Sequence, residues 1–280
     1  MIAQQIWSLI KTPEFRLKEY FHRRPDPKYN WHFCSGEEER KAEAGHQKLE
    51  DDGIVMLPAF FQGEMLKELQ AAFDKSVEDQ WCKLNPGSLQ CDEFFVQDPV
   101  YLKAALDPVL LEIIGRYYKK KFALGRSCAQ RLLPADTGRY GSYQWHHDTR
   151  GRQLHLMVLL RDLAADGQRM SYLTKSHLTY YSYLRGRGQG SRFDTDLREH
   201  PEYKDRIVEV AGPAGTVAIF DANGLHSGNR NNNGGRDQIT FCYVSVRHWK
   251  PQKFRRAEVA ALEEPFKQVV TFNPKHELVD

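Results

Sequence analysis

The second half of the chain is a series of short apolar runs separated by Gly, Pro, Asn and Asp, and this pattern constrains the fold most strongly. Runs of this kind, with no long helical segments between them, are typical of strands in an antiparallel sandwich or barrel rather than a doubly wound sheet. The sequence therefore predicts a mainly β fold from about residue 122 onward. The expected strands are 123–133, 142–148, 153–160, 170–173, 206–210, 216–220 and 237–247.

The residues before 122 have a helical pattern instead. Apolar residues recur at helical spacing over 2–10, and Ser35 with Glu38 forms a potential capping box for a charged helix ending near Asp52. An apolar run at 54–57, stopped by a proline, is expected to be a strand.

Two further helices are expected in this part of the chain. One has an apolar face from Met65 to Val77, and the other begins at Asp107 and Pro108, with aspartate as the N-cap. We expect one domain over 1–280. It would comprise a mainly helical part (1–121), a barrel (122–250) with a lid or insertion (178–205), and a helical tail (251–280).

Composition excludes several classes of protein. The 280 residues are 41% hydrophobic and 28% charged, which is typical of a globular chain, and the net charge of +3 is too small to indicate a nucleic-acid partner. No apolar stretch approaches the roughly 20 residues that span a membrane. The odd number of scattered cysteines indicates reduced thiols and a cytoplasmic protein. They are Cys34, Cys82, Cys91, Cys128 and Cys242.

The segment from Gln144 to Asp148 holds the first candidate metal ligands. Side chains alternate along a strand, so His146 and Asp148 project to the same side, roughly 6–7 Å apart, while His147 points away. Taken alone, the motif favours a capping aspartate and two surface or core histidines over a metal site, so a third ligand is needed.

His226 is the candidate for that third ligand, because it follows an apolar strand and a turn-rich corner. Two histidines and one carboxylate form the facial triad of non-haem Fe(II) sites, which leaves open positions for other ligands. Ten residues further on, Arg236 begins an apolar strand, where a buried guanidinium requires an anion. Gln238 and Thr240 are polar neighbours on the same face.

With these motifs the sequence resembles the phytanoyl-CoA dioxygenase-like family of iron(II)/2-oxoglutarate-dependent oxygenases. The resemblance extends from Asp52 to about Val246 and is carried by the H-x-D motif, the later histidine and the arginine beyond it. Ser176 and His177 also match the family, although Lys175 stands where the family often has glycine.

The resemblance implies a fold, a site and a reaction. The fold would be a double-stranded β-helix, a jelly-roll or cupin-like barrel, with the N-terminal helices packed outside. His146, Asp148 and His226 would be the catalytic iron ligands, while Arg236 would bind the distal carboxylate of 2-oxoglutarate, with Thr240 as a second cosubstrate contact. Fe(II), 2-oxoglutarate and O2 would together hydroxylate an unactivated C–H bond of a small metabolite, releasing succinate and CO2.

Two alternatives remain open at this stage. A zinc-dependent hydrolase would use the same two histidines and aspartate to activate water, and a non-catalytic jelly-roll binding protein would keep only the fold. Arginines near the expected mouth favour an anionic or polar small-molecule substrate, with no nucleic acid or membrane partner. They are Arg139, Arg150, Arg152 and Arg185.

Other conspicuous residues favour structural roles. His155 lies within an apolar strand and is interpreted as a hydrogen-bonded sheet histidine, and the context of His177 also indicates a structural role. The basic segment from Arg185 to Arg192 is interpreted as a solvated loop.

Overall fold

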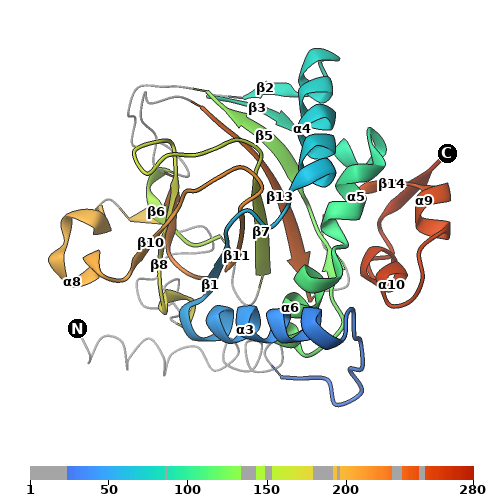
Figure 1. The fold of residues 1–280 in the computed structure, drawn as a ribbon, viewed down its shortest axis with the longest axis horizontal. Helices are drawn as coiled ribbons and strands as arrows, with labels where there is room; N and C mark the ends of the chain where they lie inside the picture. The colour runs from blue at the N-terminus through green and yellow to red at the C-terminus, as the bar shows by residue number, and fades with distance from the viewer. Residues whose placement is uncertain are drawn as a thin grey trace.

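The computed structural model describes most of the chain, and its described residues form two facing antiparallel sheets with helices outside them (Figure 1). The opening segment 2–10 and the arginines expected at the mouth lie outside the described residues. Those described are 24–85, 87–133, 143–148, 153–178, 192–193, 196–228, 235–245 and 250–280.

The larger sheet has eight strands in the order β1-β11-β7-β13-β5-β3-β2, with β4 also paired to β13. All of these pairings are antiparallel, as predicted for the strands after residue 122; β2 and β3 were not expected. The strands are β1 (Ile54–Leu57), β2 (Lys83–Asn85), β3 (Ser88–Cys91), β4 (Ala123–Leu124), β5 (Cys128–Leu132), β7 (Gln153–Leu159), β11 (Val217–Asp221) and β13 (Arg236–Val244).

The smaller sheet has five strands in the order β10-β8-β12-β6-β9. β12 lies between β8 and β6, and this place in the sheet brings its first residue next to the H-x-D motif. The strands are β6 (Trp145–His146), β8 (Met170–Leu173), β9 (Arg192–Phe193), β10 (Ile207–Val210) and β12 (His226–Gly228).

The two faces of the larger sheet contact different partners because side chains alternate along each strand. On the outer face, Ile239 and Phe241 of β13 belong to the main core formed with the helices. On the inner face, Met157 of β7 and Phe220 of β11 pack with Tyr172 of the smaller sheet. The interior between the sheets is therefore a separate cluster from the core under the helices.

Four main helices cover the outside of the larger sheet and its edge. They are α3 (Gly36–Asp52), α4 (Gly63–Glu78), α5 (Pro99–Ala105) and α6 (Pro108–Tyr118). The expected N-cap of α6 is confirmed, since the Asp107 carboxylate accepts hydrogen bonds from the backbone N–H groups of Val109 and Leu110. Among the described residues, no helix combines the length and apolarity needed to cross a membrane.

The capping box expected at Ser35 is wrong in its detail. Ser35 is the N-cap of α3, but its side chain makes no capping hydrogen bond. The next residue, Gly36, has φ of +66°, whereas a capping box requires helical dihedral angles immediately after the N-cap.

Two other local expectations are corrected. The hairpin β2–β3 brings Cys82 and Cys91 into a disulfide, so the expectation of five reduced thiols is wrong for this pair. The argument for a cytoplasmic protein loses that support. In the tail, the predicted helix near Arg256–Glu264 is shorter, and short elements follow it. The tail contains β14 (Lys253–Arg255), α9 (Arg256–Ala260), α10 (Phe266–Thr271) and β15 (Glu277–Val279).

A glycine at the turn before β11 packs closely against the backbone of the segment between β1 and α4. Gly215 has φ of +79°, and a Cβ built there would lie 1.9 Å from the backbone oxygen of Phe61. Gly63 also has a positive φ, +57°, but a Cβ built on it would meet no other described part of the chain within 4 Å.

We expect Gly215→Ala to lower the free energy of unfolding by about 2 kcal/mol or more beyond the effect of Gly63→Ala, measured by urea denaturation. Both variants incur the cost of a left-handed alanine, but only the first forces backbone atoms apart. Equal losses in the two variants would contradict this explanation.

Candidate metal centre

Two histidines face each other across neighbouring strands. His226 of β12 is the direct antiparallel partner of His146 of β6, so both side chains lie on one face of the sheet. Their ring centroids are 4.3 Å apart, and both residues are buried. The strand pairing therefore brings together two imidazoles that are 80 residues apart in sequence.

Asp148 completes the group from the loop after β6. Its backbone N–H donates to the carbonyl of Ala222 at 2.9 Å, which ties this loop to the turn before β12. Its carboxylate oxygens lie 3.4 Å from Nε2 of His146 and 3.7 Å from Nε2 of His226. One potential ligand atom from each of the three residues lies within 4.8 Å of the others, so the structure brings together the three predicted ligands.

Backbone carbonyls fix how the two imidazoles are presented. Nδ1 of His146 lies 2.7 Å from the carbonyl of Gln144, and Nδ1 of His226 lies 3.0 Å from the carbonyl of Gly224. A carbonyl only accepts, so each Nδ1 carries the proton and each Nε2 presents a lone pair toward Asp148. Lone pairs facing a carboxylate repel unless a cation lies between them, and a histidine held by its second nitrogen is the usual arrangement of a metal ligand.

The charges of these three side chains also favour a cation at the site. Burial would raise the pKa of Asp148, but the facing rings of His146 and His226, when they carry a proton on Nε2, stabilise the ionised carboxylate and hold this pKa well below its usual value. Burial lowers the pKa of His146, with a further lowering from His226. Burial also opposes the charged form of His226, yet the carboxylate of Asp148 raises its pKa overall. The carboxylate thus stays ionised and attracts a cation between the imidazoles.

A buried polar network holds the turn that leads to His226. The Asp221 carboxylate accepts hydrogen bonds from Tyr117 Oη at 2.6 Å and from the backbone N–H of Asn223. Asn223 Nδ2 donates to the carbonyl of His177, and the backbone N–H of Leu225 donates to Ser176 Oγ. The Ser-His pair therefore supports the turn beside the site, as expected for a structural His177.

The unusual lysine before this pair has a conformation that favours glycine. Lys175 has φ of +62°, in the left-handed region. Glycine enters this region without steric cost, which gives a physical reason for its frequent use at this position in the family that the sequence resembles.

Arg236 lies at the first position of β13, on the inner face, and is buried. Its Nη1 donates to the carbonyl of Gln168 at 2.8 Å, while its buried Nε has no hydrogen-bond partner among the described residues. Burial lowers the pKa of Arg236 to about 10, so the side chain is still charged at neutral pH. A buried cation with an unused donor is a site for an anion.

Thr240 lies further along the same face of β13, opposite Met157 of β7, and is half-buried. His155 of β7 lies closer to the triad than its apolar context indicated. Its Nε2 is 2.7 Å from Gln153 Nε2, and its Nδ1 is 3.9 Å from the Asp148 carboxylate. The predicted hydrogen-bonded sheet histidine is thus confirmed.

Two residues near the site were missed by sequence reasoning. Phe220 packs against the rings of both His226 and His155, at 5.4 Å and 5.3 Å. Burial lowers the pKa of His155 to about 4, so this side chain is neutral.

Gln153 is the second residue that was missed. Its Nε2 donates a hydrogen bond to Cys242 Sγ on the neighbouring strand β13, at 3.1 Å. Strict alternation along β7, β11 and β13 was the available signal, because it places all of these side chains on the inner face.

Solved structures provide an independent comparison. The chain is similar to the non-haem α-ketoglutarate-dependent epimerase SnoN from nogalamycin biosynthesis, with a TM-score of 0.59 and 16% identity over 76% of this chain and 86% of that one. It is also similar to EctD from S. alaskensis, solved with 2-oxoglutarate and 5-hydroxyectoine, with a TM-score of 0.58 and 23% identity over 80% of each chain. The fold is a double-stranded β-helix.

A third neighbour holds a metal together with the cosubstrate. HygX from Streptomyces hygroscopicus, solved with nickel and 2-oxoglutarate bound, has a TM-score of 0.55 and 16% identity over 75% of this chain and 90% of that one. Comparisons with models of known families and with curated proteins find no match. The shared fold and the His-Asp-His group are thus established, and membership of the phytanoyl-CoA dioxygenase-like branch stays a prediction.

Asp196 anchors the strand that carries His146. Its carboxylate accepts a hydrogen bond from Trp145 Nε1 at 2.9 Å and pairs with Arg198 at 2.8 Å. Burial would raise the pKa of Asp196, but the hydrogen bonds from Arg198 and Trp145 lower it to about 2.

We expect Asp196→Asn to be less stable than the parent protein at neutral pH, with a difference that shrinks as the pH falls from about 4 toward 2. In that window the unfolded state binds the proton first, so the stabilisation from the ionised carboxylate is lost. Urea denaturation of both proteins across this range measures the difference. A difference that does not change with pH would show that Asp196 stabilises β6 without its charge.

Proposed function

We propose that this protein is an iron(II)/2-oxoglutarate-dependent dioxygenase of the phytanoyl-CoA dioxygenase-like type that hydroxylates a small metabolite. The observation that carries the proposal is the convergence of His146, Asp148 and His226, with a buried arginine on the inner wall of a double-stranded β-helix. The structural neighbours support it, because they are enzymes that use 2-oxoglutarate with a non-haem metal.

The donor set fits Fe(II). Two imidazole nitrogens and one carboxylate oxygen are a facial set of ligands that leaves positions for a cosubstrate and O2. His146 and His226 would each bind through Nε2, since their Nδ1 atoms are engaged by backbone carbonyls. Once bound, the metal and its cosubstrate supply the oxidising chemistry, and the protein supplies binding, orientation and exclusion of water.

Arg236 fits the distal carboxylate of 2-oxoglutarate. Its charge is buried and its Nε lacks a partner among the described residues, so a carboxylate would both neutralise the charge and accept the unused hydrogen bond. Thr240, on the same face, is the second residue proposed to contact the cosubstrate. A zinc hydrolase would have no need of this buried cation.

The inner wall around the triad protects the reaction. Phe220 and Met157 are buried apolar side chains of this wall, and neutral His155 lies beside Asp148 without adding charge. This apolar part of the lining would help to limit the access of water to the reacting carbon. We propose a polar or anionic substrate for the site, and hydroxylation with release of succinate and CO2 as the reaction.

We expect anaerobic addition of Fe(II) and 2-oxoglutarate to the purified protein to produce a visible metal-to-ligand charge-transfer band. His226→Ala should abolish the band because one of three ligands is lost. Arg236→Met should raise the half-saturating 2-oxoglutarate concentration about tenfold or more, because the charge-assisted contacts to the carboxylate are lost.

The control for these variants is Arg116→Gln, which breaks ion pairs between α3 and α6; the described contacts of this side chain are to Glu39, Glu43 and Glu112 and include none to β12 or β13. It should leave the band and the half-saturation point unchanged. A folded parent protein that gives no band would overturn the proposal. Metal-dependent hydrolysis with zinc, independent of O2 and of Arg236, would instead establish the zinc hydrolase.

A further inference from the structure

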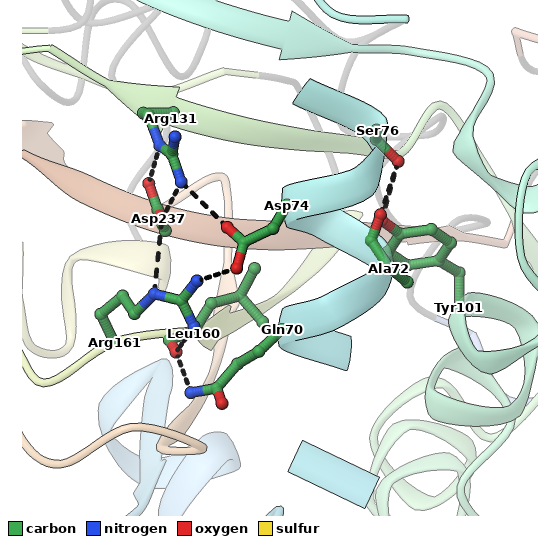
Figure 2. Close-up of polar contacts among 9 residues, drawn as sticks. All are labelled: Gln70, Ala72, Asp74, Ser76, Tyr101, Arg131, Leu160, Arg161 and Asp237. Carbon is green, nitrogen blue, oxygen red and sulfur yellow. Dashed lines mark hydrogen bonds and ion pairs between the residues drawn. The ribbon is translucent and has the colours of Figure 1, made fainter. Parts of the chain in front are cut away.

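Four charged side chains form a cluster on the outer face of the larger sheet, where β13 begins (Figure 2). Arg131 of β5 donates two hydrogen bonds of 2.8 Å to the carboxylate of Asp237. Asp74 of α4 bridges the two arginines, at 3.2 Å from Arg131 and 2.6 Å from Arg161. Nε of Arg161 also lies 3.7 Å from the Asp237 carboxylate.

The cluster ties three other elements to the start of β13. Asp237 and Arg131 are direct partners across the β5–β13 pairing, so their bidentate contact fixes the register at this end. Arg161 follows β7, the other neighbour of β13, and Asp74 belongs to the helix that covers the sheet. Gln70 of α4 adds a hydrogen bond to the carbonyl of Leu160 at 2.7 Å.

The positive and negative charges within the cluster balance, so it offers no net charge to a ligand. Two arginines face two aspartates, and only 9% of the Asp237 side chain is exposed. An anion would therefore meet both carboxylates as well as the guanidinium groups. The arrangement is suited to holding protein segments together rather than to binding a small anion.

Asp237 is the residue directly after Arg236. Asp237 points to the cluster (Figure 2). Because side chains alternate along β13, Arg236 lies on the opposite, inner face of the sheet. The described contacts of the Arg236 guanidinium amount to one hydrogen bond, to the carbonyl of Gln168. The direction and depth of this long side chain therefore depend on the backbone at the start of the strand.

We propose that Asp237, held by Arg131 and Arg161, is a positioning residue that sets Arg236 for the anionic cosubstrate. This inference rests on the proposed function. The charged cluster on the outside fixes the strand, and the strand fixes the guanidinium on the inside. Loosening the cluster lets the first residues of β13 move, which separates Arg236 from the carboxylate that it would bind.

The test is the charge-transfer titration with 2-oxoglutarate in two variants, Asp237→Asn and Arg131→Gln. Each should raise the half-saturating concentration of 2-oxoglutarate about tenfold, because a small misplacement of a charged anchor is costly. The affinity for Fe(II), measured without 2-oxoglutarate, should stay within about twofold of the parent value, since the three ligands lie on β6, on β12 and in the loop after β6.

Arg116→Gln is the matched control for stability. Arg116 also pairs with carboxylates on a neighbouring helix, and its side chain is 26% exposed against 32% for Arg131. It should lower the melting temperature to a similar degree without changing the half-saturation point. A purely structural cluster would give the same half-saturation point in all of these variants and the parent, and that result would overturn the inference.

The conservative variant Asp237→Glu distinguishes positioning by the cluster from a mere change of side chain. It keeps a carboxylate for Arg131 and Arg161, so it should retain more of the 2-oxoglutarate affinity than Asp237→Asn does. An equal loss of affinity in the two variants would count against positioning by the charged cluster. If the parent protein itself gives no band, the proposed function fails, whereas a normal parent with unaffected variants rejects this inference alone.

Discussion

The antiparallel pairing of His226 with His146 is the constraint on which the site depends. The two strands are very short, yet their register decides whether the two imidazoles share a face, because a slip of one residue would turn one of them away. Hydrogen bonds around the two strands help to hold this register in place. Asp221, Asn223 and Ser176 hold the turn before β12 through buried hydrogen bonds, and the Asp148 loop is tied to the same turn.

Because side chains alternate along β13, its first two residues lie on opposite faces of the sheet. Arg236 carries a charge into the interior, and Asp237 carries the opposite charge into a cluster outside. A buried guanidinium is costly, and the structure provides it with only one described hydrogen bond, to a carbonyl. This geometry supports the proposal that Arg236 binds an anion and is positioned from the other side of the sheet.

Much of the fold was predictable because it depends on local patterns. Strands β7, β8, β10, β11 and β13 follow apolar runs, whereas the short strands β9 and β12 were not expected. The start of α6 follows from an aspartate and a proline, whose preferences are local. The β2–β3 hairpin was not predictable from its polar sequence, and with it came the disulfide between Cys82 and Cys91. The failed capping box at Ser35 has a similar cause, since the left-handed Gly36 changes how the chain enters α3.

The sequence by itself identified the candidate metal ligands, two histidines and a carboxylate, and a distant arginine proposed for the cosubstrate, in the order that the resemblance implies. Residue types and their order were enough, because ligand chemistry is a property of individual side chains. Alternation does not place Asp148, since the expected strand 142–148 ends at His146. Only the tertiary structure decided that His155 and Phe220 lie beside the triad and that four charges gather behind Arg236. These contacts join residues on different strands and helices, and their distances depend on sheet order and packing rather than on any local pattern.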